Sequence, residues 1–135
     1  MTRVYVDMVA DLFHAGHVAF LRQARAFGDQ LVVGIHSDDD VAAYKRKPIC
    51  TMEERLAVVG ACRFVDEVIP SAPLSVDERW LDVHSLDRVV HGDDFDAERL
   101  AASYPGPLLR GILSTVPYTR GVSTSDLIAR VRLRG

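Results

Sequence analysis

Short runs of hydrophobic residues alternate along the chain with segments in which apolar residues recur every three or four positions. Short runs that are apolar throughout are typical of strands covered on both faces of a parallel sheet. The run at 31–35 shows this most clearly, because only Gly34 interrupts its large aliphatic side chains. The runs predict five strands, at residues 4–6, 31–35, 65–69, 88–90 and 109–116.

The segments between these runs have the spacing of amphipathic helices. In the first of them, Val18, Leu21 and Ala24 fall on one face. Helices are predicted at residues 16–27, 52–62 and 76–84, with a last one beginning near Ser123. Strands that alternate with helices predict an α/β fold, a doubly wound parallel five-stranded sheet with helices on both faces. The Pro-Gly-Pro sequence at 105–107 is interpreted as a turn, so residues 1–135 are expected to form one domain.

Composition narrows the class of protein further. A length of 135 residues suits a single core, and the net charge of −3 predicts neither nucleic-acid binding nor attraction to anionic membranes. No apolar run approaches the roughly 20 residues of a membrane-spanning helix, and the first residues lack a secretory pattern. We therefore expect a cytoplasmic protein. Cys50 and Cys62 have no ligand-type spacing and predict neither a disulfide framework nor a metal site.

In parallel sheets, ligands bind beyond the carboxyl ends of the strands, so the loop after the first strand is the first place to look. There His14, Gly16 and His17 precede a helix directly. The N-terminus of a helix offers unpaired N–H groups and a positive dipole, and a glycine lets an anion approach the backbone. The pattern indicates a phosphate site. Two other interpretations stay open, namely ordinary surface histidines or half of a zinc site completed by His36 or His91.

The sequence HAGH at 14–17 resembles the HxGH signature of the nucleotidyltransferase superfamily. Segments at 31–38, 51–55, 63–70, 90–94 and 121–125 resemble, in the same order, segments of the phosphoethanolamine and glycerol-3-phosphate cytidylyltransferases. The resemblance covers nearly the whole chain, which makes it more specific than HxGH alone. It implies a Rossmann-like fold, CTP as the nucleotide, a divalent cation (Mg²⁺) bound with CTP, and a homodimer.

The resemblance also implies roles for individual residues. Those expected to act in catalysis are His14, His17 and Lys45. Those expected to bind the nucleotide are Val9, Ala10, Gly16, Arg63, His91, Gly92, Asp94, Thr119, Gly121, Val122, Ser123 and Thr124. Those expected to bind the acceptor are Asp11, Lys45, Arg46 and Arg120, and no metal-ligating residue is predicted.

Two of these assignments have support from the residues themselves. Three consecutive cations at 45–47 follow the second strand and suit anionic substrates, although they also fit a solvated surface turn. Ser123 and Asp126 have the spacing of a helix cap, which is compatible with phosphate binding by the same hydroxyl. The chain also departs from the family. Tyr118 replaces the arginine that precedes the family threonine, and Asp77 replaces a lysine of the glycerol-type acceptor site.

The sequence therefore predicts a cytidylyltransferase that transfers CMP from CTP to a phospho-alcohol such as phosphoethanolamine and releases pyrophosphate. A hydroxyalkylphosphonate such as 2-hydroxyethylphosphonate is the alternative acceptor. Two further alternatives are an adenylyltransferase that shares HxGH and a non-catalytic nucleotide-binding domain. The chain could also be one domain of a larger fusion protein.

Overall fold

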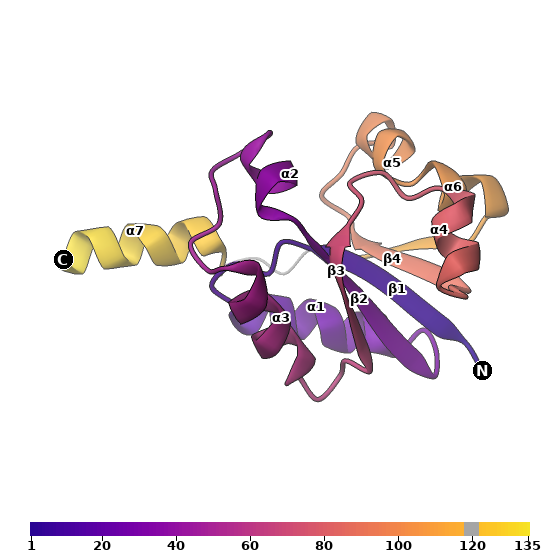
Figure 1. Ribbon diagram of the computed structural model, residues 1–135, viewed down its shortest axis with the longest axis horizontal. Helices are drawn as coiled ribbons and strands as arrows, with labels where there is room; N and C mark the ends of the chain where they lie inside the picture. The colour runs from indigo at the N-terminus through magenta and orange to yellow at the C-terminus, as the bar shows by residue number, and fades with distance from the viewer. Residues whose placement is uncertain (118–121) are drawn as a thin grey trace.

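The computed structural model describes residues 1–117 and 122–135. Within them lies a five-stranded sheet of order β3-β2-β1-β4-β5, in which every paired strand is parallel to its neighbour (Figure 1). The strands are β1 (Arg3–Met8), β2 (Gln30–His36), β3 (Glu67–Ala72), β4 (Arg88–Gly92) and β5 (Leu113–Val116). This confirms the doubly wound parallel sheet predicted from the sequence.

Helices lie on both faces of this sheet (Figure 1). They are α1 (Ala15–Arg25), α2 (Asp38–Ala42), α3 (Met52–Gly60), α4 (Glu78–Val83), α5 (Ala97–Ser103), α6 (Pro105–Arg110) and α7 (Thr124–Arg134). Helices α1 and α3 cover one face, and α4 and α6 cover the other. Helix α7 extends away from the sheet to the carboxyl end of the chain. No helix within the described residues is long and apolar enough to span a membrane.

The core explains why the strands are apolar throughout. Successive side chains of a strand point to opposite faces of the sheet. Val4 and Val6 of β1 accordingly pack with α1 and α3, whereas Tyr5 packs with the α4 side. Because both faces are covered, every side chain of the central strands must be compatible with burial, and alternation of polar and apolar residues disappears.

The region from 105 to 110 differs from the prediction. The Pro-Gly-Pro sequence does not form a turn but begins α6, and residues 109–110 belong to this helix rather than to a strand. Proline is favoured in the first turn of a helix, where its missing N–H has no partner to lose. Gly111 ends the helix in the left-handed conformation, with φ of 66°. The apolar run at 109–116 is therefore divided between two elements.

Candidate active site

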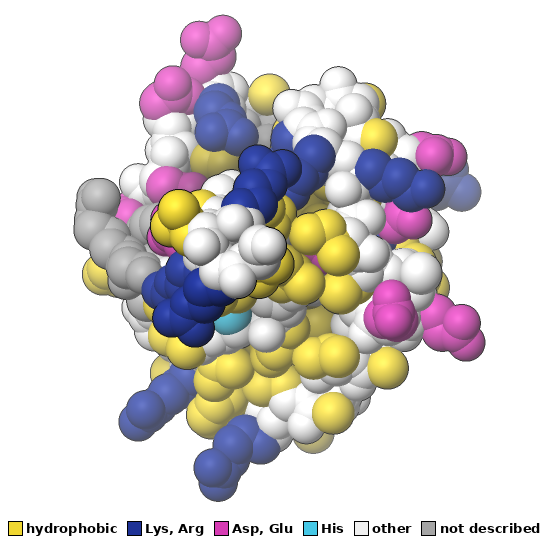
Figure 2. Space-filling view, turned by 90° about the vertical axis from the view of Figure 1, so that its left-hand side faces the viewer, with side chains coloured by type: hydrophobic (Ala, Val, Ile, Leu, Met, Phe, Trp, Pro, Cys, Tyr) yellow, Lys and Arg dark blue, Asp and Glu magenta, His cyan; other side chains and the backbone are white. Residues whose placement is uncertain are grey.

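A pocket of about 700 Å³ opens at the carboxyl ends of β1, β2 and β4. The chain leaves β1 toward β2 and β3, and later returns to the other side of β1 to form β4 and β5. Such a point, where the strand order reverses, is where parallel sheets bind ligands. On the side of the molecule that carries α7, basic side chains gather near the centre around a histidine (Figure 2). The pocket volume lies within the range typical of small-molecule sites.

The two histidines of the HAGH segment form the start of α1. His14 is the N-cap residue, and its Nδ1 accepts a hydrogen bond from the Gly16 N–H at 3.0 Å. The Nδ1 of His17 accepts one from the His14 N–H, also at 3.0 Å. The rings lie 3.9 Å apart between centroids, and Phe13 stacks on His17. Each ring is thus held in place by the backbone of its own helix.

These hydrogen bonds decide which ring nitrogen carries the proton. A nitrogen that accepts cannot be protonated, so a neutral ring bonded through Nδ1 keeps its proton on Nε2. Burial lowers the pKa of His17 to about 4, with a further contribution from His14, and burial also lowers the pKa of His14. Near pH 7 both rings are therefore neutral, with an Nε2–H that their own helix leaves unused.

The N-terminus of α7 lies against that of α1. Ser123 caps α7 by accepting from the Asp126 N–H at 3.0 Å, which confirms the predicted cap. A Cβ atom on Gly16 would lie 2.8 Å from the His14 ring and 3.2 Å from the Val122 carbonyl oxygen. A side chain at position 16 would therefore push the two helix starts apart. Two helix N-termini, both favourable to an anion, border the same pocket.

Asp11 positions backbone around the pocket. Its side chain is buried, and its two carboxylate oxygens accept hydrogen bonds from the Ile49 and Cys50 N–H groups, both at 2.9 Å. Its backbone carbonyl accepts from the Thr124 hydroxyl at 2.8 Å. Asp11 thus connects the loop after β1 to the segment before α3 and to the start of α7. The acceptor-binding role expected of Asp11 stays a prediction. Both oxygens of its carboxylate already accept from backbone N–H groups.

A buried arginine that the sequence analysis did not select supports the same loop. Arg55, on α3, is 1% exposed. Its Nη1 donates to the carbonyl oxygens of Val9 (2.8 Å) and His36 (2.9 Å), and its Nη2 pairs with Asp38 at 2.5 Å. Next to Val9, Ala10 has a φ of 58°, which is unfavourable for a residue with a Cβ. Arg55 therefore holds the carboxyl ends of β1 and β2 together beside a strained turn.

The cations predicted from the sequence lie on the segment between α2 and α3. Lys45 and Arg46 both line the pocket, and Lys47 does not. Burial, followed by the neighbouring charge of Arg46, lowers the pKa of the Lys45 ammonium. The energetic cost of partly burying this cation near another one indicates that an anion would bind there favourably.

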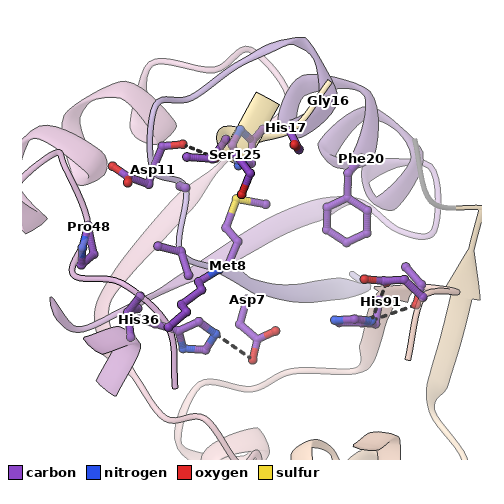
Figure 3. A pocket seen from close by; sticks show the side chains of 18 of the residues that line it. Asp7, Met8, Asp11, Gly16, His17, Phe20, His36, Pro48, His91 and Ser125 are labelled. Carbon is purple, nitrogen blue, oxygen red and sulfur yellow. Dashed lines mark hydrogen bonds and ion pairs between the residues drawn. The ribbon is translucent and has the colours of Figure 1, made fainter. Parts of the chain in front are cut away.

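The inner end of the pocket contains a carboxylate. Asp7, at the end of β1, has a side chain only 4% exposed. Its Oδ1 accepts from the Tyr104 hydroxyl at 2.5 Å, and its Oδ2 lies 3.8 Å from Nε2 of His36 (Figure 3). Asp7 and His36 lie on one wall of the pocket, and His17 and Gly16 lie on another. Because no arginine or lysine among the described residues pairs with it, Asp7 is suited to bind a cation.

The structure gathers most of the predicted site residues around this pocket. Those that line it are Val9, Ala10, Asp11, His14, Gly16, His17, Lys45, Arg46, His91, Gly92, Asp94, Val122, Ser123 and Thr124. Thr119, Arg120 and Gly121, as well as Tyr118, lie outside the described residues. Arg63 is not brought to this pocket. It lies before β3, over the Phe64 ring at 5.9 Å, at the amino edge of the sheet.

Asp7, Tyr44, Arg99 and Tyr104 also line the pocket but were not predicted. The sequence did contain a signal that Asp7 has a special role. It is a charged side chain that follows the apolar residues of β1 and precedes the apolar Met8 at the end of that strand. As for a zinc site, the described residues contain no group of three or more histidine, cysteine or acidic side chains placed to hold a metal ion.

Residues 9–130 match the cytidylyltransferase-like family model. The chain is 42% identical over 132 residues to an ethanolamine-phosphate cytidylyltransferase of Dictyostelium discoideum, covering 97% of this chain and 37% of that protein. It is 41% identical over 134 residues to the enzyme of the same name from Mus musculus, covering 98% of this chain and 33% of that protein. The chain thus spans about a third of the length of these curated relatives.

Solved structures agree on the fold. A lipopolysaccharide core biosynthesis protein from Thermoplasma volcanium is 26% identical, with a TM-score of 0.71 over 90% of this chain and 99% of that chain. Pantothenate synthetase from Thermus thermophilus, 16% identical, has a TM-score of 0.64 over 94% of this chain and 61% of that chain. The second similarity shows only that the fold is shared.

Proposed function

Because the chain belongs to the cytidylyltransferase-like family, we propose that it transfers CMP from CTP to ethanolamine phosphate and releases pyrophosphate. The relatives named above for that reaction support the proposal. The single observation that carries it is the pair of neutral imidazoles whose Nε2–H groups are left for a ligand, at a pocket bordered by two helix N-termini. This arrangement suits a polyphosphate chain.

The reaction needs no nucleophile from the protein. An oxygen of the acceptor phosphate attacks the α-phosphorus of CTP, a new P–O bond forms, and the bond from the α-phosphorus to the oxygen bridging it to the β-phosphate breaks. Pyrophosphate leaves with that oxygen and its electron pair. Catalysis then consists of alignment and of stabilising negative charge on phosphate oxygens. In this proposal, His14 and His17 donate from Nε2 to those oxygens as charge builds up.

The acceptor would lie between the cationic segment and the inner carboxylate. Lys45 and Arg46 line the pocket and supply positive charge for the acceptor phosphate. Asp7 lies at the inner end of the pocket, where its Oδ1 accepts from the Tyr104 hydroxyl, and its carboxylate suits an ammonium group because the two carry opposite charges. This placement favours ethanolamine phosphate over 2-hydroxyethylphosphonate, whose far end is an uncharged hydroxyl.

Magnesium would enter this site with the nucleotide. Mg²⁺ commonly binds through substrate phosphates and retained waters, with few protein ligands. Among the described residues, no group of three or more histidine, cysteine or acidic side chains is placed to hold a metal ion. We therefore assign no protein ligand to Mg²⁺. The homodimer and the cytoplasmic location expected from the sequence stay predictions.

The proposal is tested by measuring pyrophosphate release with each of the four nucleoside triphosphates. Each is paired with ethanolamine phosphate, choline phosphate, glycerol 3-phosphate and 2-hydroxyethylphosphonate. We expect CTP with ethanolamine phosphate to give the highest kcat/KM. A preference for ATP would instead indicate an adenylyltransferase. Nucleotide binding without turnover on any acceptor would indicate a non-catalytic domain, and either result would overturn the proposal.

The variant Asp7→Asn should separate the acceptors. Asparagine keeps the size of the side chain and an oxygen that can accept from Tyr104, but it removes the negative charge. We expect kcat/KM for ethanolamine phosphate to fall about 10- to 100-fold, the usual loss for a hydrogen bond to a charged group. For 2-hydroxyethylphosphonate the expected change is less than about threefold, because its hydroxyl carries no charge. Equal losses on both acceptors would contradict a role for Asp7 in binding the ammonium group.

A further inference from the structure

One wall of the pocket is a column of aromatic side chains, packed at tilted angles, that ends in a guanidinium group. The Tyr104 ring lies 5.3 Å from the His91 ring, and the His91 ring lies 4.2 Å from the Phe95 ring. The guanidinium carbon of Arg99 then lies 3.8 Å from the centre of the Phe95 ring. Because Tyr104 is buried and bonded to Asp7, the column has a fixed inner end. Arg99 is thereby oriented by the pocket wall although it is exposed to solvent.

The donors of Arg99 are not used within the described part of the chain. No carboxylate there forms an ion pair with its guanidinium, in contrast to Arg3, Arg25, Arg55 and Arg110. The guanidinium carbon lies over the Phe95 ring, and the planar fork of N–H groups that an arginine carries fits phosphate oxygens. Arg99 also acts electrostatically on Tyr44, where its charge opposes the rise in the hydroxyl pKa that burial causes. Arg99 is thus near the segment that carries Lys45.

We propose that Arg99 binds the phosphate of the acceptor substrate, from the α5 side of the pocket, while Lys45 and Arg46 approach it from the segment after α2. This inference rests on the proposed function. The triphosphate is assigned to the starts of α1 and α7, whereas Arg99 belongs to the wall that leads through Tyr104 to Asp7. An acceptor with its ammonium group at Asp7 would extend its phosphate outward along that wall. Arg99 is then an acceptor-binding residue and contributes little to CTP binding.

Steady-state kinetics of Arg99→Gln test this assignment. Glutamine keeps a polar side chain of similar reach but removes the charge and the fork. We expect KM for ethanolamine phosphate to rise about tenfold or more, the usual loss for a hydrogen bond to a charged group. KM for CTP should stay close to the wild-type value, and kcat should be reduced less than the acceptor KM is raised. Arg99→Lys restores the charge without the fork and should recover part of the acceptor affinity.

Two further variants make the result specific. Phe95→Leu removes the ring over which the Arg99 guanidinium lies. We expect this variant to raise the acceptor KM less than Arg99→Gln does. Arg110→Gln is the matched control, because Arg110 lies on neighbouring α6, outside the pocket lining, and pairs with Glu78 and Asp82 at 2.9 Å each. Its acceptor KM should equal that of the wild type.

The outcomes separate the two claims. An unchanged acceptor KM in Arg99→Gln, or an equal rise in the KM values for CTP and acceptor, would overturn the role of Arg99 while the wild-type enzyme still transfers CMP. Absence of CMP transfer by the wild type to any acceptor would overturn the proposed function, and the inference with it.

Discussion

Replacement of His17 by asparagine is expected to lower the turnover of CTP about 10²- to 10³-fold, equivalent to about 3–4 kcal/mol of transition-state stabilisation. The reason lies in the two ring nitrogens. Nδ1 accepts from the His14 N–H, whereas Nε2 carries the proton that, in the proposed function, is donated to a phosphate oxygen. The asparagine oxygen can take over the first role, but no atom of asparagine reaches the second. The fold should therefore remain while the chemical step slows.

His17→Gln is the matched variant. Its terminal amide reaches the position of Nε2 but leaves the His14 N–H without its partner. We expect a smaller loss of turnover than in His17→Asn, and a free energy of unfolding lower by about 1 kcal/mol, as for the loss of a cap. Single-turnover pyrophosphate release and urea unfolding measure the two effects. A His17→Asn variant that keeps more than about a third of the wild-type turnover would refute the role of Nε2.

Replacement of Arg55 by methionine is expected to lower the free energy of unfolding by about 3 kcal/mol, because two carbonyl groups each lose a donor at a cost of about 1–3 kcal/mol. Methionine fills similar space, so the loss reports the missing hydrogen bonds rather than a cavity. The Asp38 side chain is 35% exposed and can turn to water. The carbonyl groups of Val9 and His36 would lose a donor at the carboxyl ends of β1 and β2.

Arg63→Met provides the control for this prediction. Arg63 is the arginine that the family resemblance selected for nucleotide binding, yet it is exposed and lies 5.9 Å from the centre of the Phe64 ring. An exposed cation–π contact contributes at most about 1 kcal/mol, so the unfolding curve should move little. Urea unfolding of both variants, followed by circular dichroism, makes the comparison. If Arg55→Met and Arg63→Met lowered the free energy of unfolding by similar amounts, the structural role of Arg55 would be contradicted. The variant Arg55→Lys keeps the positive charge and would show how much of the stabilisation depends on charge alone.

The hydrophobic pattern predicted the strands well where an element is long or buried on both faces. Its largest errors were at residues 109–110, which belong to α6, and at the third strand, which was predicted at 65–69 and lies at Glu67–Ala72. The available signal within 109–116 was Gly111, which follows Arg110 and ends the helix in the left-handed conformation. The helices α5 and α6, of 7 and 6 residues, are too short for helical periodicity to show.

Some of the site residues were predicted from the sequence and others were missed, for reasons that also depend on local spacing. His14, Gly16 and His17 were predicted because the pattern that selected them lies within the start of one helix, which the structure confirms. Arg55 follows two glutamates in a helix and therefore looked like part of a solvated face, although it lies four residues before the buried Val59. That spacing was the available signal, since residues at i and i+4 share a helix face.

The sequence by itself determined the alternation of strands and longer helices, the cap at Ser123 and the place of His14, Gly16 and His17 at the start of one helix. Each of these depends on the spacing of side chains along a single strand or helix turn, which the order of residues specifies. Only the tertiary structure decided that Tyr104 would bond to Asp7, 97 positions away, and that the column ending in Arg99 would line the same pocket. These long-range contacts form because β1 and β4 are neighbours in the sheet. The order of the strands is set by the packing of the whole chain rather than by any local pattern.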